Sequence, residues 1–406
     1  MATYSLNKFA QPDILKKIKD ENLLQFLSPY TSYLEERGFK PKVNGSAQID
    51  YDLLCRILMQ PTEGIPPDMV DALFFVHEVA DDEMYDELLE MAKTGNVTVP
   101  ADASPADLAV MLWLKDPELI KKPHAEAMMM KPKRFLSFQS SKGKGKKPII
   151  SSGNISKLEG LMDVWFEQHK RGKGCKVLPF DMEDKEGKVY FLVRHGMPFK
   201  REGKIEDGET GSVFYRPEFH DVVVYDIEAN ELQVFNKSDG KKERAMYLSA
   251  FGQVFFNDTE YFPGDDKYTL QPLLDDGVNS LACVDIDGLA EVRLTGVQLL
   301  FRGTFSDRTI FRSKDIFKSL ESRKRDFPDY GNLVEASFQV KFDSSSKPRT
   351  VTIKTPNIAK FDRKEDAHTI ETWMKARGFI KAQEMATDED EDSDAAVEYA
   401  SEAAVA

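Results

Sequence analysis

Two short stretches of this 406-residue chain carry residues that could do hydrolytic chemistry. In the first, Arg194 and His195 directly follow an apolar run that ends at Val193. A neutral imidazole can attack a phosphoryl group while a guanidinium binds the oxyanion. In the second, Asp285 and Asp287 lie in the sequence VDIDG. One carboxylate of such a pair can act as nucleophile and the other as acid and base, with Mg²⁺ neutralising both.

The first stretch, FLVRHG around Arg194, resembles the start of the histidine phosphatase family. That resemblance implies that His195 is the phosphorylated nucleophile and that Arg194 holds the phosphate. The family continues with a helix, whereas this sequence continues with a turn, MPFKREG. The family also needs a second histidine, for which His220 and His368 are the later residues. The alternative is a strand whose polar end makes ordinary surface contacts.

The second stretch resembles the nucleophile motif of the haloacid dehalogenase-like family, Asp-x-Asp-Gly after an apolar strand. The resemblance implies that Asp285 attacks, that Asp287 is the acid and base, and that Mg²⁺ is bound. Leu289 stands where that family has Thr, and the chain continues as a strand where the family has a long crossover. Asp and Gly are also preferred in tight hairpins, so a turn at residues 285–288 is the interpretation that we favour.

A third pattern, Pro328 and Asp329 followed by Gln339 and Lys341, resembles the PD-(D/E)xK nucleases. In that family carboxylates hold Mg²⁺ and the lysine lies near the attacked phosphate. Gln339 stands where an acid is usual, so the pattern is incomplete. Mg²⁺ is expected only under these hydrolase hypotheses, and otherwise no cofactor is expected.

A basic stretch is the most informative charge feature of the chain. Residues 121–147 hold nine Lys or Arg against one acid, Glu126. The basic residues are interleaved with Phe135 and Phe138, so they could follow a phosphate backbone while the rings stack on bases. The predicted nucleic-acid contacts are Lys131, Lys133, Arg134, Lys142, Lys144, Lys146 and Lys147.

The alternative is that part of this stretch is only a linker. Residues 139–153, QSSKGKGKKPIISSG, are rich in Ser, Gly and Lys and predict a flexible basic linker. The chain ends in an acidic tail, in which Glu384 and the residues after it supply nine negative charges and no positive ones. Charge complementarity allows this tail to fold back on the basic stretch and mask it.

Elements of two kinds must position these residues. The first 138 residues predict a helical domain, with a clear helix start at Ser104-Pro105. Residues 154–382 predict a strand-rich domain, and residues 383–406 a disordered acidic tail. The expected hairpins pair residues 221–226 with 231–235, 281–285 with 289–294, and 334–342 with 349–354. The predicted fold class is therefore α+β, with an N-terminal helical domain and then a mixed domain of antiparallel hairpins with covering helices.

Composition favours a cytoplasmic protein without a membrane segment. No run approaches the ~18 apolar residues of a membrane helix, the N-terminus lacks a signal-peptide pattern, and the three cysteines are scattered. We predict a non-enzymatic interaction or regulatory protein that binds a protein partner or nucleic acid through the helical domain and the basic linker. The alternative is a metal- or phosphate-dependent hydrolase, a phosphatase or nuclease, that uses the C-terminal domain.

Overall fold

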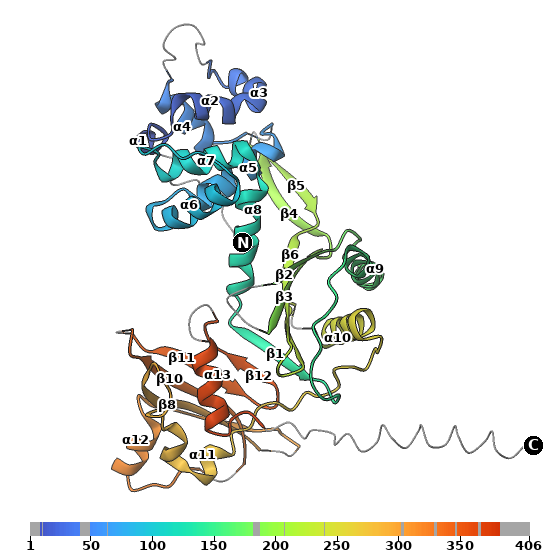
Figure 1. Ribbon diagram of the computed structural model, residues 1–406, viewed down its shortest axis with the longest axis vertical. Helices are drawn as coiled ribbons and strands as arrows, with labels where there is room; N and C mark the ends of the chain where they lie inside the picture. The colour runs from blue at the N-terminus through green and yellow to red at the C-terminus, as the bar shows by residue number, and fades with distance from the viewer. Residues whose placement is uncertain are drawn as a thin grey trace, which may run out of the picture. The chain divides into compact units, whose positions relative to one another are not determined.

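The computed structural model describes residues 9, 11–40, 49–62, 64–181, 187–206, 208–238, 240–301, 304–328, 331–345, 347–363 and 367–381 (Figure 1). The predicted acidic tail, residues 383–406, lies outside the described residues, and so does Asp329. The chain divides into two compact units, residues 1–128 and 129–406. Helices dominate the first unit and a large antiparallel sheet the second, so the predicted α+β class is confirmed.

The first unit is built from short helices around one apolar core. Ser104 caps α7 by accepting a hydrogen bond from the Asp107 amide at 3.0 Å, and Pro105 is the first helical residue, as predicted. The buried Asp107 carboxylate then accepts from the Lys19 amide and the Asn22 side chain, which ties α7 to α2. The helices are α1 (Pro12–Leu15), α2 (Asp20–Leu27), α3 (Thr31–Glu36), α4 (Tyr51–Met59), α5 (Pro67–Val79), α6 (Tyr85–Thr94), α7 (Pro105–Lys115) and α8 (Glu118–Met130).

The second unit holds a ten-stranded sheet whose neighbouring strands all pair antiparallel. The predicted hairpins β6–β7 and β10–β11 are present. Residues 281–285 do not form the predicted strand, because a 3-10 helix ends at Leu281 and a turn follows. In spatial order the strands are β2 (Lys176–Asp181), β3 (Lys188–Gly196), β6 (Glu218–Asp226), β7 (Glu231–Phe235), β1 (Arg134–Gln139), β12 (Ile358–Lys360), β11 (Arg349–Lys354), β10 (Asn332–Phe342), β8 (Leu289–Leu300) and β9 (Arg308–Arg312).

Strand β1 lies in the middle of this sheet and changes the predicted domain boundary. The first unit ends at residue 128 and not at 138, because β1 pairs with β7 and β12 of the second unit. Residues 139–153 therefore lie inside the second unit and do not join two domains. The Asn230 side chain donates to the Lys142 and Gly143 carbonyls at 2.5 and 2.9 Å, so this segment is also hydrogen-bonded to the sheet.

Helices cover opposite faces of the two halves of the sheet (Figure 1). Helices α9 (Ser152–Gln168) and α10 (Lys241–Phe256) pack on β2, β3, β6, β7 and β1 in one core. Helices α11 (Pro272–Asp275), α12 (Ile316–Ser322) and α13 (Ala367–Ala376) lie with β8, β10, β11 and β12 in another. We call the first the α9–α10 core and the second the α13 core. On β12, Ile358 contacts the α9–α10 core and Ala359 belongs to the α13 core. Because successive strand residues point to opposite faces, the two cores lie on opposite faces of the sheet.

Two further features complete the second unit. Strands β4 (Lys200–Glu206) and β5 (Glu209–Tyr215) form a separate two-stranded sheet between β3 and β6 in sequence. Within the described parts of the chain, no helix has the length and apolar character that crossing a bilayer requires.

Candidate functional sites

The phosphatase-like pair is split by the geometry of β3. Arg194 and His195 are consecutive strand residues, so their side chains point to opposite faces of the sheet. Arg194 is exposed and lies 3.8 Å from the Glu218 carboxylate, whereas His195 is 4% exposed and stacks on Phe166 of α9. His220 lies opposite Arg194, and burial lowers its pKa. The structure does not bring Arg194 and His195 to one phosphate, as the resemblance would require.

His195 instead belongs to a buried polar group that we call the His195 cluster: Arg171, His195, Asp221, Asn236, Glu243 and Tyr247. His195 Nε2 lies 3.0 Å from Asp221 Oδ2, and the Tyr247 hydroxyl donates to the same oxygen at 2.7 Å. The Lys237 amide donates to Asp221 Oδ1 at 2.9 Å. Burial, followed by the Asp221 charge, raises the pKa of Tyr247 well above its usual value, so its hydroxyl remains a donor.

Glu243 forms the second half of the His195 cluster. It lies on α10 and accepts hydrogen bonds from the Arg171 guanidinium, the Ser238 hydroxyl and the Asn236 amide. The Arg171–Glu243 ion pair is shielded from water, since the two side chains are 10% and 2% exposed. Three side chains of the cluster, those of His195, Asp221 and Glu243, place one possible metal-ligand atom each within 4.8 Å of the others.

The two aspartates of the dehalogenase-like motif lie in the turn that we favoured. Asp285 and Asp287 are exposed, and Gly288 has a φ of +85°, which suits a tight turn. The Asp285 carboxylate forms an ion pair with Arg377. Of the nuclease-like residues, Gln339 and Lys341 lie on β10, where Gln339 is half-buried and donates to the Thr350 hydroxyl at 2.9 Å and Lys341 is exposed. Pro328 is buried and precedes that strand.

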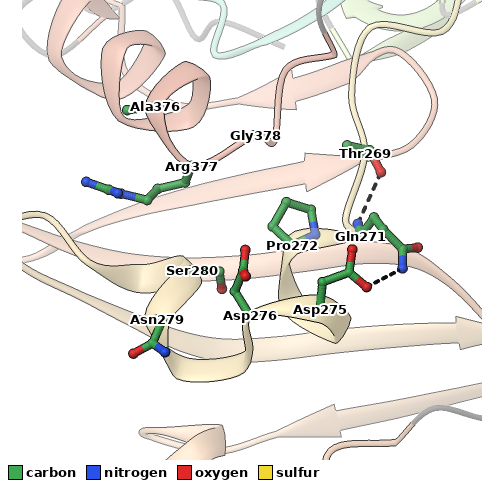
Figure 2. Close-up of a pocket in the computed structure, with 10 residues that line it drawn as sticks. All are labelled: Thr269, Gln271, Pro272, Asp275, Asp276, Asn279, Ser280, Ala376, Arg377 and Gly378. Atoms are coloured by element: carbon green, nitrogen blue, oxygen red, sulfur yellow. Dashed lines mark hydrogen bonds between the residues drawn. The ribbon is translucent and has the colours of Figure 1, made fainter.

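A polar pocket of about 590 Å³ lies near that turn, at the C-terminal end of α13 (Figure 2). Asp275 and Asp276 line it, and Figure 2 shows the Asp275 carboxylate held by the Gln271 amide. Arg377, the ion-pair partner of Asp285, also lines the pocket. Its two carboxylates come from consecutive residues of one short segment, and Asp285 and Asp287 do not line it.

The predicted nucleic-acid contacts fall at the two ends of β1. Six of the seven side chains are exposed, and that of Arg134 is half-buried. Lys131 and Lys133 precede the strand and the four others follow it, about 20 Å away for a six-residue strand. Lys133 pairs with Asp362 at 2.9 Å, and Lys142 pairs with Asp258 at 2.6 Å.

The predicted stacking of Phe135 and Phe138 on bases is wrong. Their side chains are buried, with 1% and 9% of their surface exposed. Phe138 belongs to the α9–α10 core, and Phe135 lies under the Arg363 guanidinium on the other face of the sheet. The apolar residues of RFLSFQ therefore fix β1 in the sheet and leave no ring for a base.

A second basic region is formed by the sheet face that α11, α12 and α13 do not cover. We call it the open face. On β10, Ala336, Phe338 and Val340 point into the α13 core, so Ser337 and Gln339 point the other way. The register of the neighbouring strands then places cations beside Ser337 and Gln339 on the same face. The open face carries seven cations, Arg134, Arg293, Arg308, Arg312, Lys341, Lys354 and Lys360, and two acids, Glu291 and Glu335, among the described strand residues.

The centre of the open face is lined with hydrogen-bonding groups. Ser337 and Thr352 are in contact at 3.2 Å, and Gln339 lies beside Thr350. The acids are partly neutralised, since Glu335 lies 3.9 Å from Lys354 and Glu291 lies 3.5 Å from Arg293. The face therefore presents a polar floor with an excess of positive charge.

A pocket of about 560 Å³ opens at the β8–β9 end of this face. Arg293, Arg312 and Lys314 line it together with Ser313, Gln339, Thr295 and Pro348, and in the described part of the chain no carboxylate lines it. The register of β8 against β10 shifts at Ser337, which leaves Thr295 as an extra residue. Such a bulge bends a strand and redirects its side chains, and here it lies between Arg293 and the Gly296–Arg312 pair.

The sequence matches no protein-family model, and no curated protein matches it either. Sequence reasoning missed Asp221, Glu243 and the open face. A signal for the open face was present, since residues 335–342 and 350–354 alternate polar with apolar residues, the pattern of a sheet with one solvated face. No comparable signal links Asp221 with Glu243, because they meet only through the pairing of β3 with β6 and the packing of α10.

Proposed function

We propose that this protein binds the phosphate backbone of a nucleic acid on its open face. The observation that carries the proposal is the positive charge of one solvated sheet face, which holds seven cations and only two acids among its described strand residues. Lys and Arg side chains that neutralise phosphates release condensed counterions, which supplies most sequence-independent affinity. This modifies the hypothesis from the sequence. Nucleic acid is still proposed to bind a basic region, but that region is now formed by strands β8–β12 and not by the basic stretch around β1.

The chemistry of the face favours contacts to phosphate and sugar over contacts to bases. Hydroxyl and amide side chains at Ser337, Gln339, Thr350 and Thr352 can hydrogen-bond to backbone oxygens. The described strand residues of the face include no aromatic ring, so base stacking adds little there. Binding should therefore depend strongly on salt and weakly on sequence.

The test is fluorescence anisotropy of the full chain with labelled single- and double-stranded DNA and RNA. The variant changes Arg293, Arg312, Lys354 and Lys360 to Ala. A matched control removes four exposed lysines of the same unit that lie on α9, after α9, on α12 and on α13: Lys157, Lys173, Lys318 and Lys375. A third variant changes Lys142, Lys144, Lys146 and Lys147.

We expect the open-face variant to lose at least tenfold in affinity at ~100 mM salt, because four phosphate contacts are removed. The matched control should stay within about twofold of the wild type. Equal losses in the two variants would mean that only net charge matters, and would contradict a defined site. If only the third variant, with Lys142, Lys144, Lys146 and Lys147 changed, lost binding, the site would lie at residues 142–147 and the open face would be excluded.

A further inference from the structure

We propose that the His195 cluster binds one divalent transition-metal ion, Zn²⁺ or Mn²⁺, between His195 Nε2 and the carboxylates of Asp221 and Glu243. The three possible ligand atoms lie within 4.8 Å of one another. A single small ion can span such a set, since metal–nitrogen and metal–oxygen bonds to these groups are about 2.0–2.2 Å long. The inference is independent of the proposed nucleic-acid binding.

The hydrogen bonds of His195 support a ligand at Nε2. His195 Nδ1 lies 2.9 Å from the Gly196 carbonyl oxygen, which can only accept, so Nδ1 carries a hydrogen. Nε2 then faces Asp221 Oδ2 at 3.0 Å, and this oxygen already accepts from Tyr247. Two acceptors meet at this point unless a proton or a cation lies between them. Metal-bound histidines usually donate their other N–H to a carbonyl or carboxylate, which is the arrangement at Nδ1.

A buried oxygen without a donor provides a second, independent observation. The Asn236 amide nitrogen donates to Glu243 Oε2 at 2.8 Å, which fixes the amide group in the cluster. Its Oδ1 atom is buried and has no hydrogen-bond partner among the residues that the structure describes, and the residue is 4% exposed. Buried polar atoms are normally satisfied, so this oxygen indicates a missing partner. A cation, or a water molecule bound to it, would supply that partner.

The donor set selects the class of ion. One imidazole nitrogen with carboxylate and amide oxygens suits Zn²⁺ or Mn²⁺ better than the all-oxygen ligands that Ca²⁺ and Mg²⁺ prefer. Cys175 also lies in the α9–α10 core, but burial raises the pKa of its thiol to about 12, so it stays a neutral thiol. Because His195, Asp221 and Glu243 are each at most 4% exposed, the ion would be structural and would join β3, β6 and α10.

The competing arrangement has no metal. His195 then carries a second proton and pairs with Asp221, while Arg171 pairs with Glu243, so that two cations balance two carboxylates. The two arrangements differ in one measurable respect, because a metal ion replaces the Nε2 proton. Binding to the protonated form must therefore release about one proton per ion.

The experiment uses untagged full-length protein that has been treated with a chelator. ZnSO₄ or MnCl₂ is titrated calorimetrically at pH 6.5 in two buffers of different ionisation enthalpy, and the unfolding temperature is measured with and without the metal. We expect one ion per chain, release of up to one proton and a rise in the unfolding temperature of several degrees. No stoichiometric binding by the wild type at micromolar metal would overturn the proposal.

Two variants locate the ion. Glu243→Gln removes a ligand charge and should abolish stoichiometric binding. Asn236→Ala is milder and should weaken affinity by about tenfold, the loss typical of a supporting residue around a metal. A matched control, His169→Ala, removes an exposed histidine of the same unit and should leave binding unchanged. Binding that survives both cluster variants, or that the His169 variant removes, would place the ion elsewhere on the chain and overturn the proposal.

Discussion

The two halves of the ten-stranded sheet handle charge in opposite ways. In the β2–β1 half, most of the ionised side chains that we describe lie in balanced sets that are largely shielded from water, on both faces of the sheet, although the Arg194–Glu218 pair is exposed. One such set on the face opposite α9 and α10 consists of three cations and three acids, namely Lys188, Lys267 and Arg363 with Asp226, Glu231 and Glu371, of which Lys188 and Glu371 are 19% and 22% exposed. In the β12–β9 half, the open face carries its charges in water and they do not balance.

Desolvation explains the difference. A buried charge is costly unless a partner and hydrogen bonds compensate it, so buried sets must be nearly neutral. An exposed charge keeps its hydration, and an excess of one sign costs little. Excess charge is therefore informative about ligands only on the open face, whereas in the buried half the informative feature is an atom left without a partner, such as Asn236 Oδ1.

The largest expected effect breaks one buried pair. Lys267 donates to Glu231 at 2.5 Å, and the two side chains are 7% and 0% exposed. Lys267→Met leaves the Glu231 carboxylate buried without its cation, and should lower the free energy of unfolding by about 3–5 kcal/mol. The same substitution on the open face, Lys341→Met, should change it by no more than about 0.5 kcal/mol. Urea unfolding followed by circular dichroism measures both, and equal effects would remove the distinction between the halves.

A smaller effect tests whether the predicted linker, residues 139–153, packs against the sheet or behaves as a free linker. A Cβ atom on Gly145 would lie 2.2 Å from the Ile227 carbonyl oxygen and 2.8 Å from the Tyr225 hydroxyl, whereas one on Gly143 would meet open space. We therefore expect Gly145→Ala to cost about 1–3 kcal/mol of stability, as overpacking does, and Gly143→Ala to cost little. If both substitutions were neutral in thermal unfolding, residues 142–147 would behave as the free linker predicted from their composition.

The smallest effect concerns acid stability. Burial alone would raise the pKa of Glu371, but Lys188, Arg363 and Lys267 outweigh it and lower that pKa below its ordinary value of 4.5. A lowered pKa contributes stability that is complete above pH 4.5 and is lost as the pH falls through the folded-state value. Glu371→Gln should therefore reduce the difference in unfolding free energy between pH 6 and pH 3. Urea titrations at the two pH values measure it, and an unchanged difference would show that Glu371 is not the group responsible.

The sequence predicted those parts of the fold whose partners are close along the chain. The hairpin of β6 and β7 joins two apolar runs across a four-residue turn, and the start of α7 depends on Ser104, Pro105 and Asp107 alone. The turn at Asp285 follows from the turn chemistry of Asp and Gly. In these cases local propensity and tertiary structure agree.

The remaining features depend on distant pairing. Strand β1 is six residues long and is stabilised by β7 and β12, which lie roughly 100 and 220 residues further along. Without those partners, its basic flanks and two phenylalanines suggest a binding segment. The idea that Arg194 and His195 act on one phosphate fails for a local reason, because consecutive residues of a strand point to opposite faces of the sheet. The open face could not be assembled before the strand order was known.

The salt dependence of nucleic-acid binding tests the central claim most directly. The equilibrium constant of the wild type for a short DNA duplex is measured from ~50 to ~300 mM salt, beside that of the variant with Arg293, Arg312, Lys354 and Lys360 changed to Ala. The logarithm of the constant should fall linearly with the logarithm of salt concentration, and four lost phosphate contacts should make the slope shallower by about 3 to 4. An unchanged slope, or no binding by the wild type at ~50 mM salt, would contradict binding on the open face.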